Sequence, residues 1–458
     1  MALLPPTLLA GVLTLFVLSR LRGIIRPFER WYYGIPYLVE PSQEHIKRSL
    51  ERSLGTDAGR SSSKENRKKK KNSAKDALRI VPMVMKNIDQ QFFRIVERKF
   101  MYEYDQVLIV FTAFLVVWSV EVLLRAFTQF EVMETAHHLA LGCMITCLGS
   151  LGSLVVHLGF GSNEGIAAAV VVVLSILSAL LATAPSTSNL ILDLNVEEGI
   201  QFGQSSLEDW MKANDLLETT RISRDIGRLI RICLALLCGL SSAAVLLPSQ
   251  RFSHWFFKFY INEQDDEDDE ESAKSASVSK AVVLRKVTFF ALCIDAVLPL
   301  AVSLLFFKPL LGEFLTSELA QGQLRVFRLA LLILSCLLRL SLFRVRMRDY
   351  LSTGLEQAQK LLSGEGTVNA VLLEQRVFTV HFYLPAIGLQ YIAPPLMTMA
   401  SSMVALKNIA TPNDPLLFSS FQMFAFWSSL SWGALYMVGL IGDRLTEVLL
   451  PESRLKQG

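Results

Sequence analysis

Nine stretches of this sequence are almost continuously apolar over about 18 residues or more, the length that a helix needs to cross a bilayer. In chain order they are approximately 3–19, 106–124, 137–158, 165–184, 229–247, 287–307, 326–343, 377–403 and 416–441. A segment surrounded by lipid has to satisfy its own backbone hydrogen bonds, so each run is expected to be a helix. The sequence therefore predicts an all-α fold, a polytopic transmembrane helical bundle with about nine spanning helices, or eight if the first run is a signal peptide.

The composition agrees with a membrane location. Of the 458 residues, 52% are hydrophobic, and the mean hydropathy is +0.39, which is too apolar for the surface of a soluble domain. All six cysteines lie inside apolar runs, so no extracellular disulfide framework is expected. We expect a multi-pass protein of the plasma membrane or an endomembrane, surrounded by the lipid bilayer.

Basic residues indicate the orientation of the helices. Arg20, Arg22 and further arginines directly follow the first run, which favours a retained anchor with its N-terminus outside over a signal peptide. With this orientation and nine crossings, the cytosolic segments hold 34 of the 45 Lys and Arg residues and the outer segments hold 10. Without the long first loop the counts are 14 and 10, so the bias keeps its direction.

These assignments divide the chain into segments. They are a first transmembrane helix or signal anchor at 1–19, a cytosolic basic loop with a disordered tract at 20–104, transmembrane helices two to five at 105–247, a cytosolic acidic loop at 248–286, transmembrane helices six to nine at 287–441 with an interfacial helix at 349–373, and a cytosolic tail at 442–458. A second amphipathic segment lies at 196–218. Both amphipathic segments would lie on the membrane surface or pack on the bundle.

Two loops carry runs of like charge. Arg67, Lys68, Lys69, Lys70 and Lys71 form a basic tract in a Ser-rich segment, which cannot build a core. The tract either attracts anionic lipid headgroups, at about 1 kcal/mol per cation near the surface, or is a solvated linker. The acidic run at 263–272 lacks the Gly and Glu spacing of a calcium-binding loop, so a solvated spacer is favoured.

Motifs for catalysis, cofactors and metals are missing from the sequence. It contains no HExxH, GxSxG or P-loop pattern, and the glycines at 157–165 do not complete a dinucleotide fingerprint. The basic tract has no interleaved aromatic residues, which argues against nucleic-acid binding. We therefore expect no enzymatic activity, no cofactor, and no catalytic or metal-binding residue.

Few ionisable residues are expected at membrane depth, where a charge costs about 2.5 to 3.5 kcal/mol on insertion scales. Glu121 lies near the outer end of its helix, with Arg125 one turn later, which favours a surface ion pair. His157 and His381 lie near the inner ends of their helices, which favours hydrogen-bonded imidazoles at the interface. None of these residues requires a functional explanation.

Asp295 is the exception, because it lies eight residues into the sixth run, about 12 Å deep at the helical rise. A short carboxylate cannot reach water from that depth. Arg339 lies near the inner end of the seventh run, so an ion pair between Asp295 and Arg339 on neighbouring helices is the favoured interpretation. A protonated or hydrogen-bonded Asp295 and a proton or ion pathway are the alternatives. A voltage sensor is excluded because the preceding cation, Arg328, lies eleven residues before Arg339.

The eighth run contains several helix-breaking residues. Pro385, Pro394 and Pro395 each remove a backbone hydrogen bond and favour a kink, and Gln390 adds a polar group nearby. Broken helices line substrate and ion sites in transporters. A kink that only shapes the packing is the commoner outcome, and no second broken helix is evident to complete an inverted repeat.

Two motifs show a resemblance to a known family. CLLRL at 336–340, followed by basic residues, and EQRVFTVHFYLPAIGLQYIAPPL at 374–396 are similar in sequence and spacing to the transmembrane protein 161 family. The resemblance implies multi-pass membrane proteins without an established catalytic activity, whose vertebrate members are linked to membrane excitability, cardiac rhythm and stress tolerance. The residues that match the motifs are Arg339, Gln375, Arg376, Gln390, Tyr391 and Pro394. The family assigns no active site to them.

Two functional hypotheses follow. The first is a membrane protein without enzymatic activity that modulates ion channels, membrane excitability or other membrane proteins. The alternative is an ion- or proton-coupled transporter or channel that uses Asp295 and the broken helix at 377–403. The candidate intramembrane polar residues are Asp295, Arg339, Gln390, Glu121 and His381.

Overall fold

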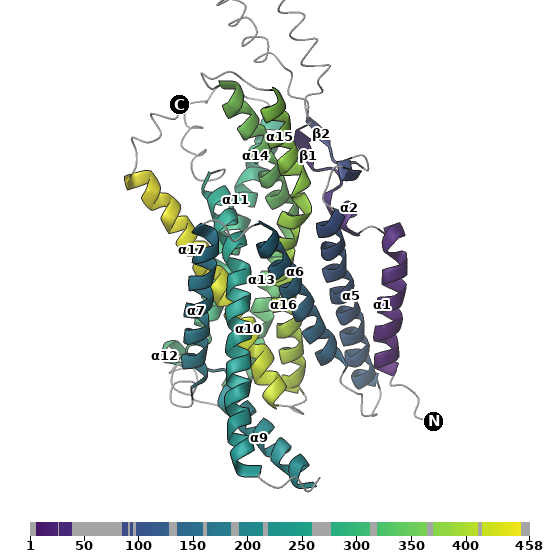
Figure 1. Ribbon diagram of the computed structural model, residues 1–458, viewed down its shortest axis with the longest axis vertical. Helices are drawn as coiled ribbons and strands as arrows, with labels where there is room; N and C mark the ends of the chain where they lie inside the picture. Colours follow the sequence, from purple (N-terminus) through teal and green to yellow (C-terminus); the bar gives the residue numbers. More distant parts are fainter. Residues whose placement is uncertain are drawn as a thin grey trace, which may run out of the picture. The chain divides into compact units, whose positions relative to one another are not determined.

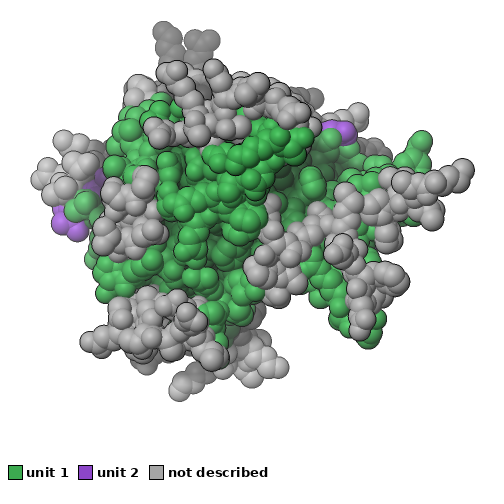
Figure 2. All heavy atoms as spheres, turned by 90° about the horizontal axis from the view of Figure 1, so that it is seen from below, with its two compact units in different colours: residues 1–25, 103–343, 389–445 green, residues 26–102, 344–388, 446–458 purple. Residues whose placement is uncertain are grey.

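The structure is a computed structural model of the chain, and it divides into two compact units (Figure 2). Unit 1 comprises 1–25, 103–343 and 389–445, and unit 2 comprises 26–102, 344–388 and 446–458. The residues that the structure describes are 6–25, 27–38, 85–89, 92–94, 98–127, 135–158, 163–184, 192–213, 219–258, 276–311, 318–363, 370–410 and 415–449. The basic tract at 67–71 and the acidic run at 263–272 lie outside them.

Unit 1 is a bundle of long helices (Figure 1). The helices that lie wholly or mainly in it are α1 (Pro6–Ile25), α5 (Arg98–Phe127), α6 (Ala136–Leu158), α7 (Asn163–Thr183), α9 (Val196–Ala213), α10 (Thr219–Phe256), α11 (Ala276–Leu304), α12 (Lys308–Leu311), α13 (Glu318–Ser341), α16 (Leu384–Ala410) and α17 (Pro415–Leu449). Most of them consist of long runs of Leu, Val, Ala, Ile and Phe, for which the helix is the conformation that leaves no backbone group unsatisfied in lipid.

Small residues allow these helices to approach one another closely. The helices α7 and α10 lie side by side (Figure 1), and a Cβ at Gly239 of α10 would lie 2.4 Å from Ile176 Cγ1 of α7. Gly433 of α17 likewise faces the backbone of α11, because a Cβ there would lie 2.8 Å from Leu300 N. Close backbone approach at small residues is typical of helix packing in membranes.

Unit 2 combines short elements with two helices. They are α2 (Pro27–Tyr32), β1 (Pro36–Leu38), β2 (Met85–Asn87), the 3-10 helix η1 (Phe92–Arg94), α14 (Phe343–Ser363), which lies mainly in this unit, and α15 (Ala370–Phe382). The strands pair antiparallel, with Tyr37 opposite Lys86. Gly34 precedes β1 with a positive φ of 81°, which glycine adopts without the steric cost of a side chain. The sequence did not predict this sheet, because its strands are very short and far apart in the chain.

Helices long enough to cross a membrane form most of the bundle. The described helices α5, α6, α10, α11 and α17 are five that qualify by length and apolar composition, and a sixth span results if α13 and α14 are counted as one bent segment. Each of the nine apolar runs overlaps described helices, so the prediction of an all-α helical membrane protein is confirmed. The number of nine crossings is not confirmed and stays a prediction.

The two amphipathic segments form helices that pack on their neighbours. In unit 1, Ile200 of α9 is buried, and a Cβ at Gly203 would lie 2.7 Å from Leu416 Cδ2 of α17. In unit 2, α14 ends before the expected limit of 349–373 and contacts α15, where the Tyr350 hydroxyl donates a hydrogen bond to the Val380 carbonyl at 2.7 Å. Contact with a neighbouring helix is compatible with both alternatives, so the position of these segments on the membrane surface stays a prediction.

The eighth apolar run is interrupted at Tyr383, between α15 and α16 and two residues before Pro385. The interruption is only one residue wide, since Tyr383 N still donates a hydrogen bond to Thr379 O at 3.2 Å. Pro394 and Pro395 lie inside α16, and the helix continues through them. Of the three prolines expected to produce a kink, Pro385 therefore accompanies the break.

Candidate intramembrane polar site

Asp295 and Arg339 form a buried ion pair in unit 1. Asp295 lies on the stripe of α11 that faces the bundle and is 1% exposed, and Arg339 lies near the end of α13 and is 5% exposed. Arg339 Nε donates a hydrogen bond to Asp295 Oδ1 at 3.2 Å. The structure thus contains the ion pair that the sequence predicted, while a functional role for it stays a prediction.

Aromatic residues complete the surroundings of Arg339. Its Cζ lies 3.9 Å from the centroid of the Trp432 ring of α17, a cation–π contact that contributes about 2 kcal/mol when it is desolvated. Tyr391 of α16 donates its hydroxyl to the Arg339 carbonyl at 2.8 Å. One guanidinium nitrogen, Arg339 Nη2, is buried without a hydrogen-bond partner in the described part of the chain. Four helices, α11, α13, α16 and α17, therefore meet around this one arginine.

Gln390 precedes Tyr391 on α16 and is also buried. Its Oε1 accepts a hydrogen bond from Arg251 Nη1 of α10 at 3.1 Å. Pro394 and Pro395 lack the N–H groups that would bond the carbonyls of Gln390 and Tyr391 one turn earlier. The part of α16 that contacts Arg339 therefore carries the Gln390 side chain and two backbone carbonyls that lack their usual helical donors.

A second buried arginine lies on the same stripe of α13. Eleven residues correspond to about three turns of helix, so Arg328 and Arg339 point to the same side. Arg328 is completely buried, and its Nη1 donates to Asp193 Oδ2 at 2.7 Å in the segment before α9. Arg325 Nη2 lies 4.0 Å from the other oxygen of Asp193, and Arg328 stacks over Phe306 at 5.2 Å. The helix α13 thus carries two buried cations, each bonded to an aspartate from another segment.

Glu121 is completely buried, so the prediction of a surface ion pair with Arg125 is wrong. Its carboxylate pairs with Lys407 of α16. Its Oε1 also accepts hydrogen bonds from the backbone N–H groups of Thr135 and Ala136 at 2.7 and 2.8 Å. A carboxylate in this position satisfies N–H groups that the first turn of α6 leaves without intrahelical partners. Burial follows because α5, α6 and α16 converge on this one carboxylate.

His381 belongs to unit 2 and is buried among aromatic rings. Its ring centroid lies 5.3 Å from those of Tyr37 in β1 and Phe92 in η1, with edge-on geometry. The sequence did not predict this aromatic cluster, because its members come from segments far apart in the chain. The side chain of His157 lies outside the described residues.

The sequence did not predict the partners Lys407, Arg251 and Asp193. Each lies at or beyond the end of an apolar run, where a charge is ordinary and predicts nothing. The sequence feature that indicates further buried partners is Arg328, which shares a helical stripe with Arg339. Two cations on one apolar face indicate buried acidic partners, but the identity of those partners depends on which segments come together.

The three buried ion pairs hold helices together. Asp295, Glu121 and Asp193 each pair with a cation on a different segment. Removing one member of a buried pair leaves an uncompensated charge, at a cost of about 3 to 5 kcal/mol. The pairs therefore fix the relative register of α11 with α13, of α5 with α16, and of α13 with the segment before α9.

Comparison with known proteins agrees with this architecture. The model of a family described as predicted transmembrane protein 161AB matches residues 2–414. No solved structure matches the chain. The matched range includes the Asp295–Arg339 pair and both motifs of the sequence analysis. Because it covers most of a chain that folds into apolar helices, the chain belongs to the transmembrane protein 161 family.

Proposed function

We propose that this protein has no enzymatic activity and modulates ion channels, membrane excitability or other membrane proteins. The observation that supports this most is the buried Asp295–Arg339 pair. A carboxylate that carries ions or protons has to meet water during transport, whereas Asp295 is 1% exposed and bonded to a guanidinium that four helices surround. Such a pair suits a scaffold that keeps its shape while it contacts a partner.

A lipid-facing helix surface supports contact with another membrane protein. Gly149 and Gly152 lie one turn apart on the exposed side of α6, and a Cβ at either position would meet no atom within 4 Å. Small residues on a lipid-facing side let a second helix approach closely. We propose that the transmembrane helix of a channel or another membrane protein packs here.

The test compares ionic currents with direct flux. Whole-cell currents of cultured excitable cells are measured with and without the protein, and the purified protein is reconstituted in liposomes for K⁺, Na⁺, Cl⁻ and H⁺ flux. We expect altered currents in cells and no flux above empty liposomes. Gly149→Leu should abolish the current change, while Gly442→Leu, at another open glycine, should retain it.

The alternative is an ion- or proton-coupled transporter or channel that uses Asp295. The observation that favours it is Arg339 Nη2, which lies beside Asp295 without a hydrogen-bond partner among the described residues. On α16, whose Tyr391 contacts Arg339, Pro394 and Pro395 remove two backbone donors. Flux in liposomes that disappears in the doubly substituted protein Asp295→Asn, Arg339→Met would establish the transporter and refute the modulator. That double variant removes the charges without leaving one of them alone, so it separates transport from folding.

The membrane in which the protein resides stays a proposal. A second proposal is that the basic tract binds anionic lipids through Arg67, Lys68, Lys69, Lys70 and Lys71. The composition of the tract supports it, at about 1 kcal/mol per cation. The test is flotation of the protein with vesicles that contain phosphatidylserine. The wild type is compared with a variant in which the five cations are replaced by Gln.

A further inference from the structure

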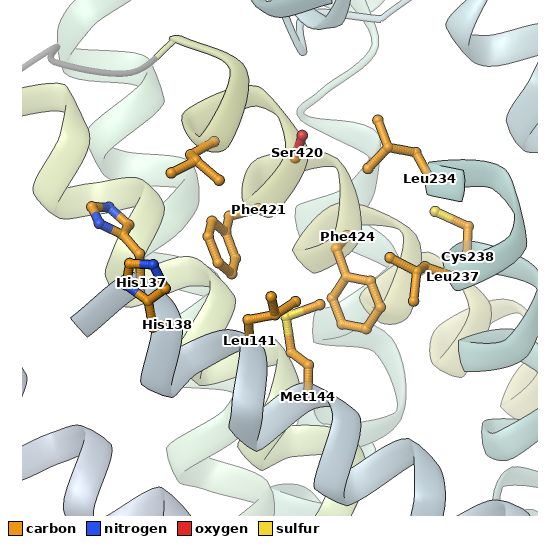
Figure 3. A pocket seen from close by; sticks show the side chains of 11 residues that line it. His137, His138, Leu141, Met144, Leu234, Leu237, Cys238, Ser420, Phe421 and Phe424 are labelled. Atoms are coloured by element: carbon orange, nitrogen blue, oxygen red, sulfur yellow. The ribbon is translucent and has the colours of Figure 1, made fainter. Parts of the chain in front are cut away.

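A pocket of about 360 Å³ lies between α6, α10 and α17 of unit 1 (Figure 3). Its walls are mostly aliphatic and aromatic, with Leu141 and Met144 from α6, Leu234 from α10, and Phe421 and Phe424 from α17. The volume lies in the lower part of the range of pockets that hold small molecules.

The surroundings of the pocket are hydrocarbon rather than water. All three helices that line it qualify as membrane spans. Leu141 lines the pocket and is itself 43% exposed, so the hollow is open beside it, on the side where a spanning helix contacts lipid. An apolar pocket that opens there is filled by what the bilayer supplies, which is the apolar chain of a lipid.

Two histidines lie at one side of the pocket. Figure 3 shows His137 and His138, from the first turn of α6, on the side opposite Leu234 and Cys238. His137 is buried and its Nε2 is 3.0 Å from Asn408 Oδ1. His138 is exposed and has no hydrogen-bond partner among the described residues. Its imidazole can donate or accept a hydrogen bond, so it is available to a polar headgroup near the end of the helix.

We propose that this pocket binds an acyl chain of a membrane glycerolipid, with an ester or hydroxyl oxygen of the lipid at His138. At about 30 Å³ for each unit the size of a water molecule, the volume corresponds to about twelve such units, which suits part of an acyl chain. A rigid four-ring sterol has more than twice as many carbon atoms, so it exceeds this volume and is disfavoured.

The headgroup is expected to be uncharged where it meets the protein. The Glu121 carboxylate already occupies the first backbone N–H groups of α6, immediately before His137. Glu121 also pairs with the Lys407 ammonium, so these N–H groups and that cation are already bound and do not favour the free anion of a fatty acid. This proposal is separate from channel modulation, and either can fail without the other.

Photocrosslinking tests the proposal on the full-length protein in lipid nanodiscs. The probes are a phosphatidylcholine with a diazirine in one acyl chain, a diazirine fatty acid and a diazirine sterol, and crosslinked peptides are identified by mass spectrometry. Leu141→Trp fills the opening of the pocket. Ile145→Trp is the matched control, since Ile145 is 58% exposed one turn further along α6 and does not line the pocket.

We expect the phosphatidylcholine probe to label pocket residues of α6, α10 and α17, and Leu141→Trp to reduce this labelling by about tenfold or more, corresponding to about 1.4 kcal/mol of binding free energy. Ile145→Trp should leave it unchanged. Equal labelling at Leu141 and Ile145 with no effect of Leu141→Trp would show ordinary surrounding lipid and overturn the proposal, as would preferential labelling by the sterol or the fatty acid.

A second pocket-filling variant controls for misfolding of the first. Ser420→Phe fills the pocket from α17, and Ser178→Phe is its control at an exposed serine of α7. All variants are compared by size-exclusion profile and thermal unfolding. If Leu141→Trp misfolds, Ser420→Phe decides: reduced labelling in a folded protein supports the lipid site, and unchanged labelling refutes it.

Discussion

The buried pair of Asp295 and Arg339 allows a quantitative prediction. Asp295→Asn removes the negative charge but keeps the shape, and it leaves the Arg339 guanidinium alone in a site that is 5% exposed. An uncompensated buried charge of this kind costs about 3 to 5 kcal/mol. The unfolding equilibrium should therefore shift by roughly 100- to 4,000-fold toward the unfolded state, at 1.4 kcal/mol for each tenfold change. The stacking on Trp432 at 3.9 Å remains in the variant and does not replace the lost pair.

The double variant Asp295→Asn, Arg339→Met should recover most of this loss. Replacing both members of a buried pair by uncharged groups is often neutral or stabilising, because both charges then lose their desolvation cost. Methionine also keeps a favourable contact with the Trp432 ring, through its sulfur. We expect the double variant to be clearly more stable than Asp295→Asn alone.

The assay is equilibrium unfolding of the purified protein in mixed micelles by titration with dodecyl sulfate, followed by tryptophan fluorescence. The wild type, both single variants and the double variant form a double-mutant cycle. The exposed pair of Asp225 and Arg228, at 3.4 Å with both side chains more than 60% exposed, is the control and should show a coupling of about 0.5 kcal/mol or less. If the effects of Asp295→Asn and Arg339→Met add within about 0.5 kcal/mol, the pair is not coupled and the reasoning fails.

Four further variants are compared in the same assay. Glu121→Ala should lower the free energy of unfolding by about 3 to 5 kcal/mol, because it leaves the Lys407 ammonium buried without its partner and removes the acceptor of the first turn of α6. Gly433→Ala should cost about 1 to 3 kcal/mol, since its Cβ would lie 2.8 Å from a backbone nitrogen of α11. Gly442→Ala, at an open position on the same helix, should gain up to about 1 kcal/mol. Burial raises the pKa of Tyr32 well above its ordinary value of 10.0, so the unfolded chain ionises first and the stability should fall as the pH rises above about 10, a dependence that Tyr32→Phe should reduce.

The outcomes that would contradict these predictions are specific. Hydrogen exchange in the first turn of α6 that is unchanged in Glu121→Ala would show that this carboxylate does not hold the helix start. Equal effects of Gly433→Ala and Gly442→Ala would argue against the close contact of α17 with α11. For Tyr32, the same pH profile in the wild type and in Tyr32→Phe, measured between about pH 8 and 11, would place its hydroxyl in water.

The candidate site was predictable only where the depth of a residue inside an apolar run by itself requires a buried partner. Asp295 lies so far inside an apolar run that it needs a partner in the bundle, and Arg339 was the nearest suitable cation on a neighbouring run. Glu121 was interpreted wrongly because Arg125 is near in sequence, whereas its real partner, Lys407, lies on α16. Local spacing identifies partners on one helix and says nothing about a helix that arrives from elsewhere in the chain.

The sequence by itself determined that the chain forms apolar helices in a membrane, because the length and composition of each run decide this without reference to any other run. It also determined the family, since the motifs at 336–340 and 374–396 are local strings of residues. Only the tertiary structure decided which charges neutralise one another, that Arg328 and Arg339 bind aspartates from different segments, and that α6, α10 and α17 leave a pocket between them. The physical reason is that ion pairs and cavities depend on the distances between helices, and those distances follow from the packing of side chains far apart in the sequence.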